Sequence, residues 1–181
     1  SLREAGIDRE VLTLLDLHDR VDQRNEDQQR IKWRWFVDRI GKAKKEVTIA
    51  VTGKYTALRD AYASIIKACE HAGVHTGVNV NLRWIDTTQL EPAAVVRRLA
   101  DVDGVIVPGG FGIRGTEGKI ACCQYARENK IPYLGLCLGF QMAVIEYARN
   151  VCGLKDANST EFTPRCENPV IDVLPEQKKI E

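Results

Sequence analysis

The sequence has 181 residues, 44% of them hydrophobic and 28% charged, with 26 Lys and Arg against 25 Asp and Glu. This composition is typical of an ordinary soluble domain, and a net charge of +1 provides no general field that would attract nucleic acid or an anionic membrane. No apolar run approaches the roughly 20 residues of a membrane helix, and the start of the chain has no secretory signal core. The six cysteines have no zinc-binding spacing. We therefore expect reduced thiols and a cytoplasmic protein, with neither nucleic acid nor membrane as a partner.

The first 45 residues differ from the rest of the chain, because they are dense in charge and hold two amphipathic patterns. Val11, Leu14 and Leu15 are spaced for one short helix, and the apolar residues around Trp33 and Phe36 for a second. No Gly or Pro interrupts residues 7–40, which excludes a flexible linker. We predict a helical linker over residues 1–45 and a separate domain over residues 46–181.

From Val47 onward, short apolar runs alternate with helical patterns. This alternation predicts an α/β fold with an open, mostly parallel sheet and helices on both faces. Ligands bind beyond the carboxyl ends of the strands in such sheets, which directs attention to Gly109-Gly110 and to Cys137. We expect strands at 47–51, 78–85, 104–107 and 133–136, helices over 57–72 (closed by Gly73), 93–99, 115–129 and 139–152, and a further β-rich segment at 170–173.

Cys137 lies in the pattern Gly135-Leu136-Cys137-Leu138-Gly139, between a predicted strand and a predicted helix. This is the cysteine form of the nucleophile elbow, in which side chains at the two glycine positions would collide with neighbouring backbone. The turn puts the sulfur at a helix N-terminus, where the dipole and the free N–H groups favour thiolate over thiol. The N–H of Leu138 is then placed to donate to an oxyanion. The alternative is a buried structural cysteine at the end of a strand.

The segment Pro108-Gly109-Gly110-Phe111-Gly112 follows the strand predicted at 104–107. Glycines let a backbone approach a ligand closely and present bare N–H groups, so this loop is a candidate for the second oxyanion donor. A tight turn without chemistry is the alternative. A phosphate-binding loop is not favoured, because the Gly-Lys-Ser/Thr ending is missing.

Together, the elbow and the glycine loop resemble the glutaminase domain of triad-type glutamine amidotransferases. Three further motifs resemble the CTP synthase family: Gly53-Lys54-Tyr55 followed by Asp60-Ala61-Tyr62, the extended loop from Pro108 to Lys119, and the segment from Asp156 to Phe162. The likeness runs from about Val47 to Phe162, and residues 1–45 would be the end of a synthetase domain and its linker. The resemblance implies a flavodoxin-like glutaminase domain, truncated here.

The resemblance also implies the residues of the site. Cys137 would be the catalytic nucleophile, and Glu161 would supply the carboxylate that binds the substrate ammonium; without the motif it would be a solvated loop carboxylate. Gln141 lies one helical turn beyond the cysteine and would face the same pocket. The residues implied to contact glutamine are Gly110, Leu138, Gly139, Phe140, Gln141 and Glu161.

For the complete enzyme, the resemblance implies the ATP-dependent amination of UTP to CTP with ammonia released from glutamine. ATP, Mg²⁺ and the allosteric activator GTP would serve that enzyme, whereas this segment would hold no cofactor and no metal. Its partners would be glutamine and the synthetase domain, and the full-length enzyme would be a homotetramer.

A histidine base is missing from the expected position. Nucleophiles of this type need a histidine and an orienting carboxylate, and in this family both follow the cysteine. The three histidines here, His18, His71 and His75, all precede Cys137. We therefore expect the sequence to be an internal part of a longer enzyme and the isolated chain to be inactive in glutamine hydrolysis.

Two alternative functions remain open from the sequence. One is a non-catalytic glutamine-binding or assembly module, which the missing histidine slightly favours and against which the preserved elbow and oxyanion loop argue. The other is a different cysteine-elbow amidotransferase, against which the opening Gly53-Lys54-Tyr55 and the segment from Asn158 to Phe162 argue.

Overall fold

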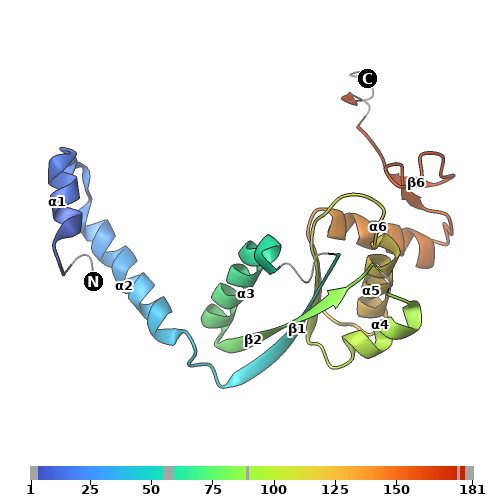
Figure 1. Ribbon diagram of the computed structural model, residues 1–181, viewed down its shortest axis with the longest axis horizontal. Coiled ribbons are helices and arrows are strands. Elements are labelled where there is room, and N and C mark those ends of the chain that lie inside the picture. Colours follow the sequence, from blue (N-terminus) through green and yellow to red (C-terminus); the bar gives the residue numbers. More distant parts are fainter. Residues whose placement is uncertain (1–3, 55–58, 89, 175, 178–181) are drawn as a thin grey trace. The chain divides into compact units, whose positions relative to one another are not determined.

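The computed structural model describes residues 4–54, 59–88, 90–174, 176 and 177 (Figure 1). The chain divides into two compact units, Ser1–Ala43 and Lys44–Glu181, which we describe separately.

The first unit consists of two α-helices, α1 (Ile7–Leu14) and α2 (Gln23–Arg39), with a short 3₁₀ turn, η1 (His18–Arg20), between them. Asp22 caps α2, because its side chain accepts hydrogen bonds from the Arg24 and Asn25 amides, both at 3.1 Å. Both predicted helices are therefore present. Much of their apolar surface is exposed in the described residues, including Leu14 at 79% and Ile31 at 69%.

The second unit is built on a four-stranded, all-parallel sheet with the order β2-β1-β3-β4. Strands β1 (Lys45–Gly53) and β2 (Val78–Asp86) pair along nine residues each, whereas β3 (Gly104–Val107) and β4 (Tyr133–Gly135) pair along three. Since all four strands run in the same direction, their carboxyl ends meet at one edge of the sheet. Both segments singled out from the sequence follow that edge.

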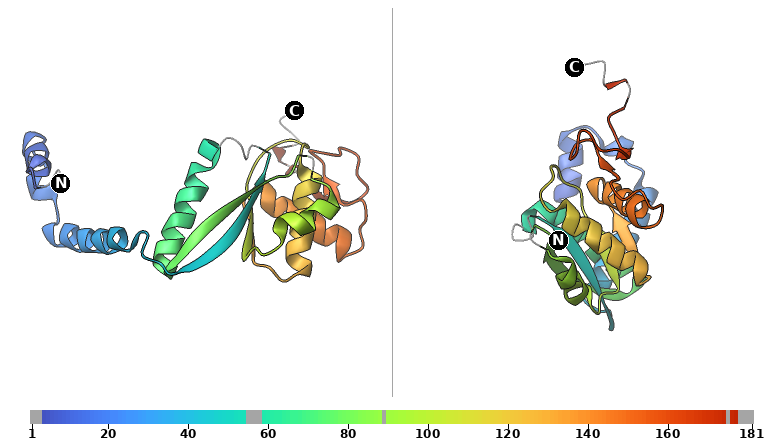
Figure 2. Two further views of the ribbon diagram at one scale, coloured as in Figure 1. Left: turned by 60° about the horizontal axis from the view of Figure 1, so that its bottom comes forward. Right: turned by 90° about the vertical axis from the view of Figure 1, so that its right-hand side faces the viewer.

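Helices cover both faces of this sheet, as the sequence predicted. Helix α3 (Ala63–Thr76) packs on β2, and the left view of Figure 2 shows it on the opposite side of the sheet from α4 (Pro92–Leu99), α5 (Thr116–Glu128) and α6 (Leu138–Asn150). The strand order requires this, because the step from β1 to β2 runs one way along the sheet, whereas the steps from β2 to β3 and from β3 to β4 run the other way. Right-handed crossovers then place α3 on one face and both α4 and α5 on the opposite face. The core between the sheet and the second helical layer includes Val105, Val107, Ile120, Met142 and Ile145.

The boundaries of α3 differ from the prediction. The first two residues of the predicted helix lie outside the described residues, and Arg59–Tyr62 form a 3₁₀ turn, η2. The helix then continues past Gly73 to Thr76 and ends at Gly77, whose φ of 74° is the left-handed conformation that glycine adopts readily. Gly73, the predicted end of the helix, is instead buried within it.

The β-rich segment near the C-terminus also differs from a strand of the main sheet. Residues Pro169–Ile171 form β6, which pairs with β5 (Asn158–Ser159) in a separate two-stranded parallel sheet beside α6. In the part of the chain that the structure describes, no helix is long and apolar enough to cross a membrane.

Candidate active site

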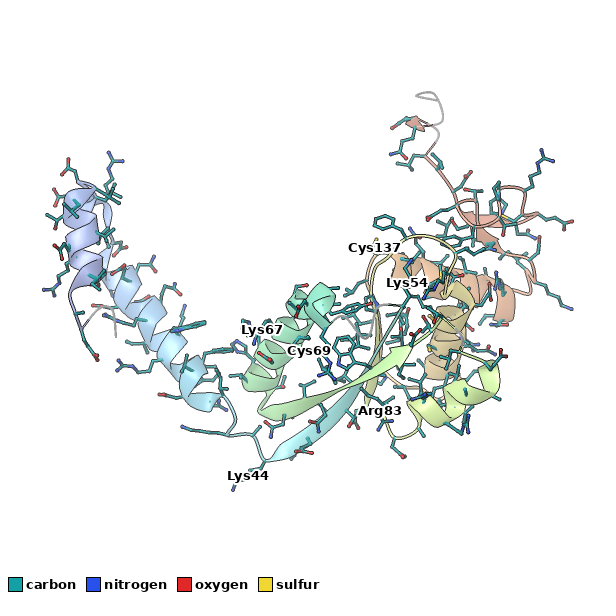
Figure 3. The ribbon with its side chains drawn as sticks, viewed as in Figure 1. Lys44, Lys54, Lys67, Cys69, Arg83 and Cys137 are labelled. Carbon is teal, nitrogen blue, oxygen red and sulfur yellow. The ribbon has the colours of Figure 1, made fainter. Side chains whose placement is uncertain are left out.

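Cys137 lies between the end of β4 and the first residue of α6, and it is exposed. Its φ of 52° and ψ of −111° put a residue other than glycine in a strained conformation. Strain of this kind costs about 1–3 kcal/mol and persists only where the surrounding structure imposes it. Figure 3 shows Cys137 at the same end of the sheet as Lys54, which follows β1.

The two glycines that flank Cys137 explain how the strain is maintained. A Cβ atom added to Gly139 would lie 1.8 Å from the Val107 carbonyl oxygen. A Cβ atom added to Gly135 would lie 2.6 Å from the Phe140 amide nitrogen. Both distances are far below any van der Waals contact, so the first turn of α6 can lie against β3 and β4 only without these side chains. The collisions predicted from the elbow pattern are present.

Several backbone N–H groups at the site, among them those of Leu138 and Gly110, have no backbone acceptor among the described residues. Leu138 begins α6, and the first hydrogen bonds of this turn are donated instead by the amides of Gly139 and Phe140. The amide of Gly110 likewise donates to no backbone acceptor in the described residues. Free N–H groups of this kind are what an oxyanion requires.

The glycine loop comes directly against the cysteine. A Cβ atom added to Gly109 would lie 3.4 Å from Cys137 Cβ and 3.9 Å from its Sγ, and one added to Gly110 would lie 3.6 Å from a methyl group of Leu138. The elbow and the loop, which the sequence placed after two different strands, therefore form one continuous site.

Three side chains hold the loop in place. Lys54 Nζ donates to the Phe111 carbonyl oxygen, and the Gly112 amide donates to Glu161 Oε1 at 3.1 Å. One peptide unit, Phe111–Gly112, is thus bound at both its ends. From beneath, Lys119 Nζ donates to the Pro108 carbonyl oxygen at 3.5 Å.

Burial lowers the pKa of Lys119 from its ordinary value, and repulsion from Lys54 lowers it further. The thiols of Cys123 and Cys137 act on this pKa in the opposite direction. Electrostatic interaction therefore reaches from Lys119 through the loop to the exposed cysteine.

A second polar chain supports the elbow from below. Cys123 Sγ donates to the Tyr133 hydroxyl oxygen at 3.1 Å, and the Tyr133 hydroxyl donates to the Gly139 carbonyl oxygen at 2.6 Å. Burial raises the pKa of Cys123 to about 12, so the thiol stays protonated and can donate.

The structure brings the residues predicted to contact glutamine to one end of the sheet, with different exposures. Leu138 and Gly139 are buried, Gln141 is half-buried, and Phe140 and Glu161 are exposed. Tyr55 of the opening motif lies outside the described residues. Sequence reasoning missed Lys119 as part of the site, although its position gave a signal: it shares one helical stripe with the buried residues Cys122, Cys123 and Ala126.

Other features lie away from the cysteine. His71 and His75 belong to the second half of α3, which leads into the start of β2, at the opposite edge of the sheet from Cys137. Among the described residues, no group of three His, Cys, Asp or Glu is placed to hold a metal ion. A cavity of about 250 Å³ opens between the end of β2 and the start of α5, lined by Thr87, Thr88, Leu90, Glu91, Ile113, Gly115, Thr116, Glu117, Gly118, Asn158 and Phe162.

Comparison with known proteins identifies the fold and the family. The glutamine amidotransferase class-I family model matches residues 57–178. The solved structure described as the Trypanosoma brucei CTPS glutaminase domain with bound acivicin is similar with a TM-score of 0.67 and 43% sequence identity. This likeness covers 71% of the present chain and 50% of the solved one.

Two curated relatives are CTP synthases. The protein from Carboxydothermus hydrogenoformans is 53% identical over 99% of this chain and 32% of its own length, and that from Methanocaldococcus jannaschii is 48% identical over 100% of this chain and 34% of its own length. The chain thus spans about a third of the length of these relatives. It belongs to the class-I glutamine amidotransferase family, and the resemblance to CTP synthases that its motifs predicted is confirmed.

Proposed function

We propose that this chain carries the glutamine-hydrolysing site of an enzyme that aminates UTP to CTP at the expense of ATP. The observation that supports this most is the position of Cys137: exposed, on a strained turn at the start of α6, with the glycine loop against its side chain. A structural cysteine needs none of these features.

In the proposed reaction, the Cys137 thiolate attacks the side-chain amide carbon of glutamine. The carbonyl oxygen becomes an oxyanion, which the N–H groups of Leu138 and Gly110 stabilise. When the oxyanion collapses, the C–N bond breaks, the nitrogen takes up a proton and ammonia leaves, so that a thioester remains on Cys137. Water then attacks the thioester through a second oxyanion, which releases glutamate and restores the thiol.

Substrate binding is assigned to the residues around the nucleophile. Glu161 has one oxygen bound to the Gly112 amide, and among the described residues no hydrogen bond engages its second oxygen, which suits the ammonium group of glutamine. Gln141 and the backbone around Phe140 would contact the rest of the substrate. A carboxylate that binds both the substrate and the loop would link glutamine binding to the shape of the oxyanion site.

The names and lengths of the relatives support the assignment of the whole reaction to a longer protein. The proposed partner is a synthetase domain that uses ATP, Mg²⁺ and UTP and receives the ammonia, in a cytoplasmic homotetramer activated by GTP. In this assignment the unit at the start of the chain is the linker to that domain, and the chain itself binds glutamine alone.

The proposal is tested by labelling the chain with the electrophilic glutamine analogue acivicin. We expect Cys137 to be modified first, glutamine to slow this modification, and the Cys137→Ala variant to remain unlabelled at the site. Cys152, which is also exposed, is the internal control and should react slowly and without protection by glutamine. Equal labelling of both thiols, unaffected by glutamine, would contradict the proposal.

Turnover is a separate expectation. Because no histidine follows Cys137, a polypeptide of these 181 residues should release ammonia from glutamine no faster than its Cys137→Ala variant. Steady ammonia release that depends on Cys137 would show that another group serves as the base.

A further inference from the structure

Lys119 is buried in an unusual way. It lies in the first turn of α5 and is only 3% exposed, although a lysine is rarely buried to this extent without a partner. Its hydrogen bond to the Pro108 carbonyl is long, at 3.5 Å, and no carboxylate pairs with it in the described ranges. Glu146, a carboxylate buried to a similar extent, is held by Arg127 with contacts of 2.7–3.1 Å. The Lys119 ammonium therefore has N–H donors without strong acceptors and a charge that no carboxylate neutralises in the described ranges.

The groups that face this ammonium all belong to the candidate site. The Pro108 carbonyl and Gly110 lie against it, since a Cβ atom added to Gly110 would be 3.6 Å from Lys119 Nζ. The charged or titratable groups that act on it are Lys54 from the end of β1, Cys123 from α5 itself and Cys137 from the elbow.

The loop lies between Lys119 and the cysteine. The C=O and N–H of a trans peptide point in opposite directions, so a Pro108 carbonyl directed at Lys119 turns the Gly109 N–H away from it. A Cβ atom added to Gly109 would meet Cys137, whereas one added to Gly110 would meet Lys119 Nζ and Leu138. If the ammonium is lost, the Pro108 carbonyl is left buried without a donor, and the peptides after it lose their anchor.

We propose that Lys119 is a positioning residue for glutamine hydrolysis: its ammonium fixes the loop Pro108–Gly110 in the conformation that faces the oxyanion, and places a positive charge beside the Cys137 thiolate. This inference deepens the proposed function and rests on it. Neither the family match nor the elbow pattern assigns a role to this lysine.

A merely structural role makes a different prediction. If Lys119 only filled space, replacement by the unbranched apolar residue methionine would leave the site unchanged. If it stabilised the fold by its charge, the replacement would lower stability. A positioning charge with an incomplete set of acceptors predicts instead that Lys119→Met is at least as stable as the wild type, because the gain from removing a buried charge outweighs the loss of the donor to the Pro108 carbonyl, and that it is impaired at Cys137.

The experiment compares the chain with Lys119→Met, Lys119→Arg and the matched control Lys67→Met, which removes an exposed lysine of α3. Three quantities are measured: the acivicin labelling rate of Cys137, the pH profile of its alkylation by iodoacetamide, and the thermal unfolding midpoint. Peptide mass spectrometry separates Cys137 from the other five cysteines.

For Lys119→Met, we expect labelling by acivicin to slow by about tenfold, less than the roughly 10²–10³ lost with a whole oxyanion donor. The alkylation profile should move to higher pH, and the unfolding midpoint should stay or rise. Lys119→Arg, which keeps the charge and the donors, should recover most of both losses, and Lys67→Met should match the wild type. If Lys119→Met does not fold, the same three measurements on Lys119→Gln, which also removes the charge, test the inference.

Labelling at the wild-type rate with an unshifted profile in Lys119→Met would overturn the inference while leaving the proposed function intact. If glutamine gives no protection even in the wild type, the proposed function fails. The alkylation profile, which needs no glutamine site, then decides by itself whether Lys119 acts on Cys137.

Discussion

The elbow and the glycine loop meet at Cys137, but they are held by different kinds of force. The elbow is fixed by exclusion: Gly135 and Gly139 lie so close to neighbouring backbone that the chain has no other path. The loop is fixed by attraction, through Lys54, Lys119 and Glu161, whose polar side chains bind its carbonyl and amide groups. The nucleophile is therefore set rigidly, whereas the oxyanion loop depends on charges that a ligand or a mutation can change.

The largest effect should come from Gly139→Ala, which adds a side chain where the neighbouring backbone leaves no space for one. Its Cβ atom would meet the Val107 carbonyl oxygen at 1.8 Å, so the variant should lose about 3 kcal/mol or more of unfolding free energy and most labelling at Cys137. The matched control is Gly153→Ala, where nothing lies within 4 Å and only the positive φ of 76° opposes the change. Its cost should stay at about 1–2 kcal/mol, measured by urea denaturation. Equal losses in the two variants would show that the elbow is not held by steric exclusion.

Alkaline pH should weaken the polar support below the elbow. Burial raises the pKa values of Cys122 and Cys123 to about 12, compared with an ordinary value of 9.0. Above about pH 9 the unfolded chain releases these protons while the folded chain retains them. The unfolding free energy should therefore fall as pH rises from about 9 toward 12, by about 1.4 kcal/mol per pH unit for each thiol. Denaturation curves from pH 8 to 11 test this. In the Cys123→Ala variant, the fall of unfolding free energy with pH should be smaller by the contribution of one thiol. The same slope in wild type and variant would contradict this account.

Glu161→Gln should act on substrate binding alone. The amide oxygen can still accept from the Gly112 N–H, so the loop stays bound, but the charge offered to the substrate ammonium is lost. A charged hydrogen bond is worth about 1.5–3 kcal/mol, so glutamine should protect Cys137 from acivicin roughly ten- to hundredfold less well. The control is Glu167→Gln, an exposed carboxylate of the same segment, which should leave protection unchanged. Unaltered protection in Glu161→Gln would remove this residue from the glutamine site.

The smallest effect should be a gain in stability at the nucleophile itself. Glycine tolerates the φ of 52° at position 137, whereas alanine does not. We expect Cys137→Gly to be more stable than Cys137→Ala by about 1 kcal/mol, with labelling abolished in both. Calorimetry of the two variants provides the comparison. A less stable glycine variant would mean that the turn is not strained.

The sequence predicted the elbow well, because its requirements are local. Two glycines around a cysteine, a strand before and a helix after leave few other conformations. The alternation of apolar runs with helical patterns predicts the parallel sheet, but not its strand order, β2-β1-β3-β4. The end of α3 was harder, because Gly73 and Gly77 are the same residue type and only the packed structure shows which one takes a positive φ.

The support of the loop could not be predicted in the same way. The bonds from Glu161 to Gly112 and from Lys54 to Phe111 join residues 49 and 57 positions apart, and no local pattern indicates them. Lys119 was recognisable only as a charged residue on an otherwise apolar helical stripe. Sequence periodicity predicts that such a charge is buried, but it does not predict which buried acceptor the charge will bind.

The unequal lengths of the strands have a consequence for the order in which the site gains and loses its structure. Both pairs of strands are joined by a single α-helix, but β1 and β2 pair over nine residues, whereas β3 and β4 pair over three. The longer pairing has more contacts to hold it together, so we expect β1, α3 and β2 to form the folding nucleus of the second unit. The elbow, anchored on the two short strands, is then completed late and opens first. Amide hydrogens of β4 should accordingly exchange with solvent well before those of β1, and a ligand held at Cys137 would slow exchange most at the end of the sheet that is formed last.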